Sequence, residues 1–515
     1  MVKSASPNST FNKIDPVDFI LDGQDGKIPR TNSNCSHSKR HSCANCLPID
    51  PYDAEYLKEK DIKHMSLHAY IRSKTDGHGK STKSLHVLET INCKLLPNCD
   101  SGHRPYPNGI CTKCRPQTVS LNRQVYRNVD NISIENDTVA NKFLDSWRRD
   151  GNQRVGYLIG VYEVFPDVPL GIKGRVCAIY EPPQTSGPDF VKFEEDPNEE
   201  AVDKLCGLMS MKRIGWVVTD LFTKDAANGQ VHCVRHPESF LMTAKECITA
   251  GHFQNKYKNV SKYTEEGYFG SKFVTLVVSG DQANQIHFSG YQVSEQCTAM
   301  VDADIICPTN YPELASVRTA EPNSKQFITD VQFIEKNEYG VQVHRDAKPM
   351  PVEFLLVDVP AGKPKVPEST FHVLGEDSVP FPIENRTQHL EPQDLTSVWK
   401  YIKQFREEEL VEMTSNFHFL LWLLTNKIVT FTPEEIEPLV SALTKMDGTS
   451  ILKWYKSNSN WNTLIGLCQV HEAHPEQPST PLKTSDNAGC WACNFCTFQN
   501  IAKDTDCAMC NLPKS

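Results

Sequence analysis

The chain lacks several features that define whole classes of protein. Its longest apolar run, Phe417 to Leu424, contains a histidine and is far shorter than the ~20 apolar residues that span a bilayer. The polar N-terminus has no apolar stretch typical of a signal peptide. No Gly-x4-Gly-Lys-Ser/Thr motif for nucleotide phosphates occurs. We therefore expect no transmembrane segment and no secretion by the signal-peptide route.

An excess of positive charge is also missing. The formal net charge is -10 over 515 residues, which argues against nucleic acid or an anionic membrane as the main partner. The length allows about two to four domains. Of the 19 cysteines, many stand in metal-ligand spacings and the rest are scattered, several of them in apolar segments. This usage favours a reducing compartment such as the cytosol or the nucleus.

The most specific motif ends the chain. Residues 490–515 contain Cys493-x2-Cys496 and, ten residues later, Cys507-x2-Cys510. Four thiolates at this spacing can share one tetrahedral Zn2+, and so few apolar residues surround them that the metal must supply the folding energy. Since four protein ligands leave no position for water, we interpret this segment as a binding module rather than a hydrolytic centre.

The pattern of this segment resembles the small ribbon-type zinc finger of Ran-binding and ubiquitin-reading proteins. In the ubiquitin-reading branch the resemblance assigns Thr497, Phe498 and Met509 to the contact with ubiquitin. An exposed Phe and Met on so small a module are typical of a contact surface. Packing of these residues against the rest of the protein is the structural alternative. Single-stranded RNA is a less favoured ligand, because the segment is not basic.

Two further zinc sites are predicted near the N-terminus. In the first, His37, Cys43 and Cys46 supply three ligands, and either His64 or His68 supplies the fourth. We favour His64, in which case His68 is a packing residue or a hydrogen-bond partner of the site.

The second site combines Cys99, His103, Cys111 and Cys114 in a loop rich in proline and glycine. Such a loop has no helical or strand periodicity, so a metal is expected to replace a hydrophobic core. Cys93 is an alternative to Cys99. With four protein ligands each, both N-terminal sites are predicted to be structural.

Helical and strand patterns alternate after Val129. Asp137 or Thr138 is expected to cap a helix, and another two helices are expected at 201–211 and 243–252. Strands are expected at residues 155–164, 175–180, 214–219, 273–278 and 287–293. This order indicates an α/β or α+β domain with a layered sheet.

Two pieces of that region, residues 153–160 and 214–220, resemble the MPN fold of JAMM zinc deubiquitinases. An active member needs a glutamate, two histidines and an acidic ligand; here Gln153, Val218 and Asp220 stand at the first three positions, and Thr243-x2-Glu246 loosely matches the last motif. Val218 cannot bind a metal and Gln153 cannot act as a base. We therefore expect a catalytically inactive scaffold, and a metal-dependent deubiquitinase of the JAMM type is the disfavoured alternative.

The predicted organisation is a multidomain α/β protein with an MPN-like scaffold. Thr432-Pro433-x-Glu435 reads as a capping box that opens one helix of the C-terminal helical domain. The expected segments are a disordered tail and connector (1–29), paired zinc-binding modules (30–125), an inactive MPN-like domain (126–390), a helical domain (391–470), a linker (471–489) and a ubiquitin-binding zinc finger (490–515).

Five local strings carry a resemblance that extends from about residue 19 to residue 515. They are HMSLHAY (64–70), PNGICTKC (107–114), LNRQ (121–124), GYFGSKFVT (267–275) and FPIENR (381–386). With the order of the predicted domains, they resemble the nuclear protein localisation protein 4 family.

This resemblance implies a non-enzymatic adaptor with no catalytic residues and three structural Zn2+ ions. Members bind ubiquitin and polyubiquitin chains, form a heterodimer with a ubiquitin-fusion-degradation partner protein, and dock on the hexameric AAA ATPase called valosin-containing protein. The implied role is delivery of polyubiquitinated proteins for unfolding, extraction and proteasomal degradation, including ER-associated degradation. The implied location is cytoplasmic and nuclear, and at most peripheral at the ER membrane.

Family members usually begin with a ubiquitin-like domain that docks on the ATPase. Only about 36 residues precede the first predicted zinc ligand, too few for a domain of roughly 80 residues. We therefore expect this chain to bind the ATPase more weakly than a version extended by that domain, because one of several linked contacts is missing.

Overall fold

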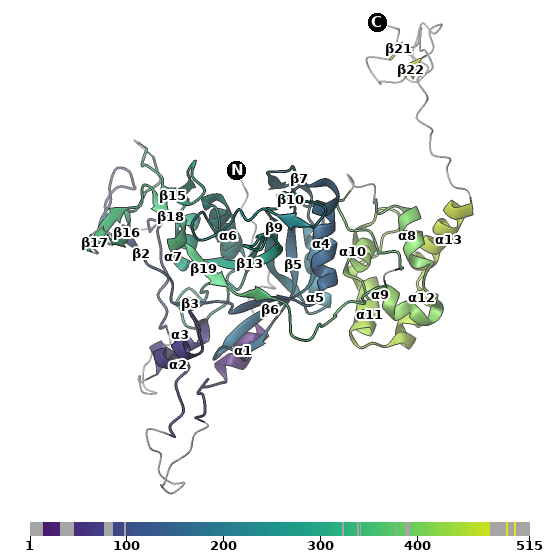
Figure 1. Ribbon diagram of the computed structural model, residues 1–515, viewed down its shortest axis with the longest axis horizontal. Helices are drawn as coiled ribbons and strands as arrows, with labels where there is room; N and C mark the ends of the chain where they lie inside the picture. Colours follow the sequence, from purple (N-terminus) through teal and green to yellow (C-terminus); the bar gives the residue numbers. More distant parts are fainter. Residues whose placement is uncertain are drawn as a thin grey trace.

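The computed structural model describes residues 14–30, 46–76, 86–96, 99–321, 324–336, 339, 341–375, 377–386 and 392–473. It also describes two short strands near the C-terminus, β21 (Trp491–Ala492) and β22 (Gln499–Asn500), which pair antiparallel. An N-terminal region, a mixed α/β body and a helical region follow one another along the chain. Figure 1 shows the helical region at one end of the molecule and the strands β2, β16 and β17 at the other.

An eight-stranded sheet forms the centre of the body, in the order β19-β13-β12-β9-β5-β6-β4-β20. Most neighbours are antiparallel, whereas β9–β12, β4–β6 and β4–β20 are parallel. The strands are β4 (Asn131–Ile134), β5 (Val155–Phe165), β6 (Gly171–Tyr180), β9 (Lys212–Thr219), β12 (Val274–Gly280), β13 (Ile286–Val293), β19 (Leu356–Val359) and β20 (Ala361–Gly362). The five predicted strands are confirmed, and β6 begins earlier than the sequence pattern indicated.

Both faces of this sheet are buried, which explains the nearly continuous apolar runs of its inner strands. Side chains alternate between the faces along a strand. On β5, Tyr157 and Ile159 join one apolar cluster and Leu158 joins the other. On β9, Val218 joins the first of these clusters and Val217 joins the second.

One short segment closes the sheet on itself. In β19, Val359 pairs with Gly290 of β13, and two residues later Ala361 of β20 pairs with Ile132 of β4. The backbone N–H of Ile132 also donates to the Pro360 carbonyl at 2.9 Å. A Cβ atom on Gly290 would lie 2.4 Å from the Val359 carbonyl oxygen, so this close approach requires glycine. Segment 356–362 thus holds both ends of the sheet and leaves neither as a free edge.

Helices α4 (Asp137–Asp150), α5 (Glu199–Leu208), α6 (Ala244–Lys256) and α7 (Glu295–Asp302) belong to the body. The prediction that Asp137 or Thr138 caps α4 is wrong. Asn136 is the N-cap, and its side-chain oxygen accepts from the Val139 N–H at 3.2 Å. Asn is among the best N-cap residues, and it precedes the two candidates in the same polar run.

Smaller sheets surround the body. They are a sheet of β14 (Ile306–Pro308), β15 (Leu314–Val317) and β18 (Met350–Pro351), and a sheet of β17 (Gln342–Asp346), β16 (Val331–Lys336) and β2 (Val119–Leu121). Two hairpins are formed by β7 (Gln184–Ser186) with β8 (Val191–Phe193), and by β10 (Thr223–Asp225) with β11 (Gln230–Val231). A 3-10 turn, η1 (Val352–Phe354), precedes β19.

The predicted helical C-terminal region is confirmed. It contains α8 (Leu395–Ile402), the 3-10 turn η3 (Glu407–Glu409), α9 (Leu410–Thr414), α10 (Phe417–Thr425), α11 (Pro433–Thr444), α12 (Gly448–Ser457) and α13 (Ser459–Ala473). The capping box of α11 is present: the Glu435 N–H donates to Thr432 Oγ1, and the Thr432 N–H donates to Glu435 Oε2. Tyr401 and Phe419 are fully buried in its core, where their ring centroids lie 5.6 Å apart.

The N-terminal region contains α1 (Pro16–Asp22), α2 (Ala54–Glu59), β1 (Met65–Ser66) and α3 (Leu67–Thr75). Strand β1 pairs in parallel with β3 (Tyr126–Arg127), which leads into the body. Arg127 donates to the backbone carbonyl and the carboxylate of Asp358 in β19. The segment that closes the central sheet therefore also anchors the N-terminal region.

A buried charge cluster joins α1 to α3. His68 Nε2 lies 3.0 Å from Asp18 Oδ1, and His68 Nδ1 lies 3.5 Å from Asp22 Oδ1. The ammonium groups of Lys272 and Lys262 bind the same two carboxylates, Asp18 and Asp22 respectively, from the loop before β12. Burial on its own lowers the pKa of His68, but the hydrogen bonds to both carboxylates outweigh burial and hold the pKa above its ordinary 6.5.

This cluster predicts that α1 is held less firmly at alkaline pH. Because the folded-state pKa of His68 is raised, its contribution is complete below about pH 6.5 and is lost as the pH rises through the folded value. Asp18 and Asp22 have lowered pKa values, so their contribution is lost only below about pH 3.8. Hydrogen exchange of the α1 amides, corrected for intrinsic pH effects, should show a lower opening free energy at pH 9 than at pH 6.

A His68→Asn variant is the control for this prediction. We expect it to open more easily than wild type at pH 6, by about 1.5–3 kcal/mol, and to lose the pH dependence. An equal pH dependence in both proteins would show that His68 does not hold α1.

Among the described residues, none of the helices combines the length and the hydrophobicity needed to cross a membrane.

Candidate functional site

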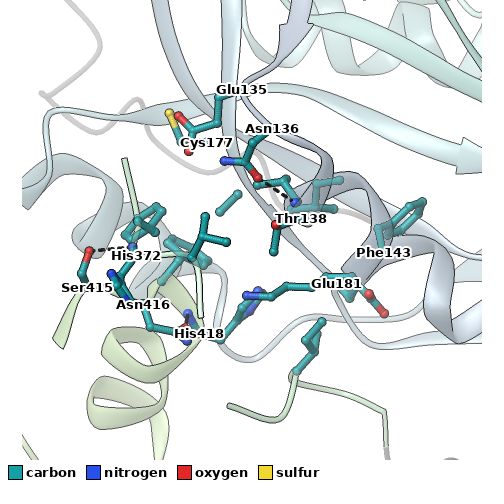
Figure 2. A pocket seen from close by; sticks show the side chains of 18 residues that line it. Glu135, Asn136, Thr138, Phe143, Cys177, Glu181, His372, Ser415, Asn416 and His418 are labelled. Carbon is teal, nitrogen blue, oxygen red and sulfur yellow. Dashed lines mark hydrogen bonds between the residues drawn. The ribbon is translucent and has the colours of Figure 1, made fainter. Parts of the chain in front are cut away.

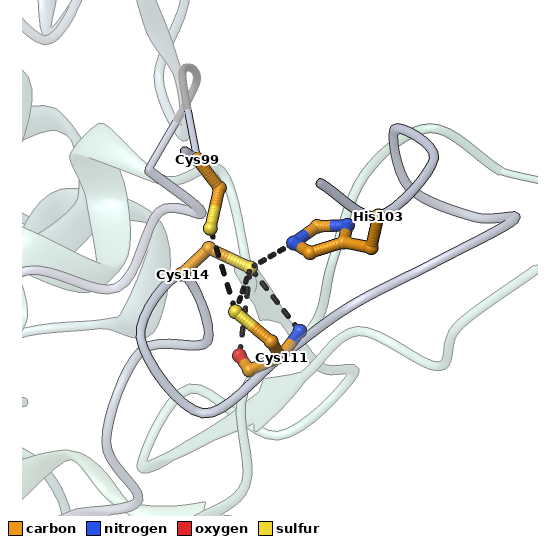
Figure 3. Close-up of side chains that lie close together, drawn as sticks. All are labelled: Cys99, His103, Cys111 and Cys114. Atoms are coloured by element: carbon orange, nitrogen blue, oxygen red, sulfur yellow. Dashed lines mark hydrogen bonds between the residues drawn. The ribbon is translucent and has the colours of Figure 1, made fainter. Parts of the chain in front are cut away.

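Four predicted zinc ligands converge in the loop between residues 99 and 114. The ligand atoms of Cys99, His103, Cys111 and Cys114 all lie within 4.8 Å of one another (Figure 3). Three of the separations are 3.4 Å (Cys99 Sγ to Cys111 Sγ), 3.7 Å (Cys111 Sγ to Cys114 Sγ) and 3.4 Å (Cys114 Sγ to His103 Nε2). A tetrahedron with Zn–S bonds of about 2.3 Å has edges of about 3.8 Å, so this donor set fits Zn2+.

Neighbouring polar groups prepare these side chains for a metal. His103 Nδ1 lies 2.7 Å from the Arg104 carbonyl, so the Nδ1–H tautomer directs the Nε2 lone pair toward the sulfur atoms. The pKa of Cys111 is lowered to about 5, mainly by the hydrogen bond with the Ser101 hydroxyl and less by the hydrogen bond with the Cys114 backbone. The pKa of His103 is raised to about 9, mainly by the hydrogen bond with the Arg104 carbonyl and less by the hydrogen bond with the Cys99 thiol. Zinc binding is therefore expected to displace a proton from His103 and to use a thiolate that already forms easily.

Contacts with the body fix the orientation of this loop. The Leu96 N–H donates to the Cys114 carbonyl at 3.1 Å. Arg115 forms an ion pair of 3.1 Å with Asp330 and also lies over the Phe327 ring. Since the loop has little core of its own, the metal and these contacts together determine its shape.

The alternative ligand Cys93 does not join this cluster. Its side chain is 1% exposed within the large apolar cluster, and burial, helped by Asp302, raises its pKa to about 11. A thiol in that environment resists ionisation and behaves as a small apolar residue. The structure thus favours Cys99 over Cys93.

The first predicted zinc site is described only in part. His37 and Cys43 lie outside the described residues, whereas Cys46 is half-buried. His64 Nδ1 lies 2.9 Å from the Gln124 carbonyl, and His64 Nε2 lies 3.2 Å from Asp358 Oδ1. In this arrangement both ring nitrogens of His64 face protein oxygens, as do those of His68. The ligand set of this site therefore stays a prediction.

The C-terminal finger lies mostly outside the described residues. This holds for its four predicted ligands, Cys493, Cys496, Cys507 and Cys510, and for the predicted ubiquitin contacts Thr497, Phe498 and Met509. Strands β21 and β22 pair Trp491 with Asn500, which brings together the two ends of the segment that contains the first knuckle. The finger assignment itself stays a prediction.

The side-chain amide of Gln153, the residue predicted at the place of a JAMM-type base, is hydrogen-bonded within the body. Gln153 Oε1 accepts from the Thr219 hydroxyl at 2.8 Å and from the Leu221 N–H at 3.1 Å. Its Nε2 donates to the carbonyls of Pro188 at 2.7 Å and Leu221 at 2.9 Å. The side chain is 2% exposed. A buried amide with all these partners acts as a structural link between loops and cannot take up a substrate proton.

A guanidinium group lies between the two carboxylates of this region. Arg235 Nε donates to Asp220 Oδ2 at 2.6 Å, and its two terminal nitrogens donate to Glu246 at 2.7 and 2.9 Å. The Arg235 side chain is only 6% exposed. Burial raises the pKa of Glu246, but Arg235 outweighs burial and the pKa ends below its usual value. Glu246 is therefore ionised, and one internal cation lies between the two acidic residues.

Thr243 and Glu246, the pair that loosely matches the last JAMM motif, form the capping box of α6. Thr243 is the N-cap of α6, its Oγ1 accepts from the Glu246 N–H, and Glu246 Oε2 accepts from the Thr243 N–H. This capping box turns the Glu246 carboxylate toward Arg235. Val218 lies on the neighbouring strand β9, 6% exposed and packed within the large apolar cluster. A valine at this position offers no ligand atom to a metal, and Arg235 already binds both carboxylates.

Sequence reasoning missed Arg235. Its sequence context, Val234-Arg235-His236-Pro237, carries no motif, and it lies 11 positions before Glu246. Only an indirect signal could have indicated Arg235 from the sequence: two acidic residues that are expected at one buried place need a cation beside them.

The fold and the zinc-type cluster define a mixed α/β multidomain protein with an N-terminal zinc-binding region and a helical C-terminal region. The chain belongs to the NPL4 family: the model described as "NPL4 family" matches residues 154–469, and the model described as "NPL4 family, putative zinc binding region" matches residues 12–151.

Proteins similar to this chain have names of the same family. The nuclear protein localization protein 4 homolog 1 of Caenorhabditis elegans is 46% identical, over 97% of this chain and 98% of that protein. The Homo sapiens homolog is 41% identical, over 97% of this chain and 82% of that protein. The Saccharomyces cerevisiae protein is 35% identical, over 88% and 79% of the two chains.

Proposed function

We propose that this chain is a non-enzymatic adaptor that binds polyubiquitinated proteins and delivers them to an AAA segregase ATPase. The proposal rests on the hydrogen bonds of Gln153 and on the salt bridges that Arg235 forms with Asp220 and Glu246. At the positions where a JAMM deubiquitinase resemblance would require a base and metal ligands, this chain has an amide and an internal salt bridge. Membership of the NPL4 family supports the same reading, because the resemblance implies a cofactor of the ATPase rather than an enzyme.

The proposed assembly has three kinds of partner. Ubiquitin chains would bind the C-terminal finger and the MPN-like and helical domains. The hexameric valosin-containing protein would bind the N-terminal zinc modules, and a ubiquitin-fusion-degradation protein would complete a heterodimer. The names of the relatives point to nuclear protein localization, and we propose cytoplasmic and nuclear sites of action, including substrates extracted at the ER membrane.

We further propose three structural Zn2+ ions per chain. The cluster of Cys99, His103, Cys111 and Cys114 supports one of them by its geometry. The other two rest on the spacing of the N-terminal and C-terminal motifs. None of the three sites would leave a coordination position open for catalysis.

A double substitution in the finger tests the ubiquitin-binding part of the proposal. We expect Thr497→Ala with Phe498→Ala to weaken binding of polyubiquitin by at least tenfold, because the finger adds avidity to a second ubiquitin site on the same chain. Binding is measured on immobilised chains, and zinc content should be unchanged. A matched control is Thr90→Ala with Phe19→Ala, an exposed threonine and an exposed phenylalanine of the N-terminal region. If the finger variant binds chains as tightly as this control, the finger has another partner.

A further inference from the structure

A cavity with both polar and apolar walls lies between the α/β body and the helical region. Its walls come from the start of α4, from β6, from the crossing segment 371–373 and from the start of α10. Figure 2 shows Glu135, Asn136 and Thr138 on the body facing His372, Asn416 and His418 on the other side. The cavity has a volume of about 40 Å³, which leaves room for more than one water. Pockets between domains commonly bind small molecules.

The acidic groups that line this cavity already have partners. Glu135 binds Arg175 at 3.0 Å and accepts from the Thr370 hydroxyl at 2.8 Å. Glu181 is bound by two guanidinium groups, those of Arg154 and Arg386. These carboxylates are therefore not available to a further cation.

Several groups contributed by the helical region have partners as well. His418 Nδ1 lies 2.8 Å from Glu384 Oε2. Asn416 Oδ1 accepts from the N–H groups of His418 and Phe419, so the first amides of α10 are capped within the chain. Two donors of this helix end are therefore already in use.

Lys142 of α4 carries a charge in this cavity without such a partner. It lines the cavity and is half-buried, and among the described residues its ammonium has neither a hydrogen bond nor an ion pair. Burial lowers the pKa of Lys142, and no neighbouring carboxylate offsets that effect. An ammonium withdrawn from water without a counter-charge is costly, and a bound anion would remove that cost.

We propose that this interdomain cavity binds a small carboxylate with an apolar tail, and that Lys142 neutralises the carboxylate. A single cation matches a monoanion better than it matches a phosphate, which carries up to two charges. The remaining walls are largely apolar, formed by Val139, Phe143, Ile179, Phe371, Val373 and Phe417, and they fit an alkyl or aliphatic side chain. Such a ligand would touch the body and the helical region together and hold them in this arrangement. The proposal does not depend on the adaptor function.

The test is a ligand-observed NMR titration of the full chain with hexanoate, with hexanamide as its uncharged match. Hexanoate should bind with a Kd on the order of 1 mM, as expected for a ligand of this size, and hexanamide should bind at least tenfold more weakly. N-acetyl-leucine and N-acetyl-leucinamide form a second pair, which distinguishes the terminal carboxylate of a peptide from a free acid as the source of the group.

Three variants locate the site. Lys142→Met should weaken hexanoate binding at least tenfold, Lys142→Arg should retain it because the charge is kept, and Lys245→Met, an exposed lysine on α6, should leave it unchanged. Circular dichroism verifies that each variant is folded. Equal binding of hexanoate and hexanamide, or unchanged binding by Lys142→Met, overturns the proposal.

Discussion

Replacement of Arg235 by methionine is expected to lower the free energy of unfolding of the α/β body by about 3–5 kcal/mol. The substitution keeps an unbranched side chain of similar reach but leaves the carboxylates of Asp220 and Glu246 facing each other without their cation. Glu246 begins α6 and Asp220 follows β9, so the repulsion should separate these two elements first. Calorimetry measures the total loss of stability, and hydrogen exchange of the α6 and β9 amides shows whether these two elements open more easily than the rest.

Two control proteins separate charge from packing in this experiment. The triple variant Asp220→Asn, Arg235→Met, Glu246→Gln removes the unpaired charges and should recover most of the stability. Arg148→Met breaks an exposed i,i+3 pair with Asp145 and should cost at most about 1 kcal/mol. If Arg235→Met is no more harmful than Arg148→Met, Arg235 does not hold the two elements together.

Substitution of Cys111 by serine is expected to remove one zinc ion per chain. Cys111 lies between Cys99 and Cys114 in the cluster and has a lowered pKa, so its loss removes a thiolate that forms easily. Even loss of an outer hydrogen-bond partner costs roughly 10–100-fold in metal affinity, and loss of a ligand should cost more. Because this loop depends on the metal for its shape, residues 99–114 should become sensitive to proteolysis.

The control for the zinc experiment is Cys307→Ser. Cys307 undergoes the same chemical change in β14, outside the cluster, and serine can keep its hydrogen bond to the Ser316 carbonyl. Zinc per chain, measured by plasma mass spectrometry, should be unchanged in Cys307→Ser and lower by one in Cys111→Ser. Equal zinc content in both variants would show that the cluster is not a zinc site.

Much of the fold could be predicted because the local signals agree with the tertiary structure. The apolar runs of β5 and β9 and the capping boxes of α6 and α11 each specify an element within a few residues. The closure of the sheet by segment 356–362 could not be predicted in this way. It depends on the pairing of Val359 with Gly290 and of Ala361 with Ile132, which are far apart in sequence.

The candidate sites follow the same division. Cys99, His103, Cys111 and Cys114 are close in sequence, so their spacing alone predicts a common ion, and the structure brings them together. Arg235 acts through partners on two separate elements, and its role emerges only from their packing. The sequence could not decide whether His64 is a metal ligand. A histidine that contacts a carbonyl and a carboxylate, as His64 does here, looks the same in a sequence as a histidine that binds a metal.

Incubation of the purified chain with polyubiquitin tests the central claim most directly. The assay follows chain binding and the release of mono-ubiquitin together, with and without a zinc chelator. Our account predicts that the chain retains polyubiquitin and releases no mono-ubiquitin, because Gln153 is not a base and Arg235 binds the carboxylates that a metal would need. Multiple-turnover release of mono-ubiquitin that stops when the chelator is added would contradict it.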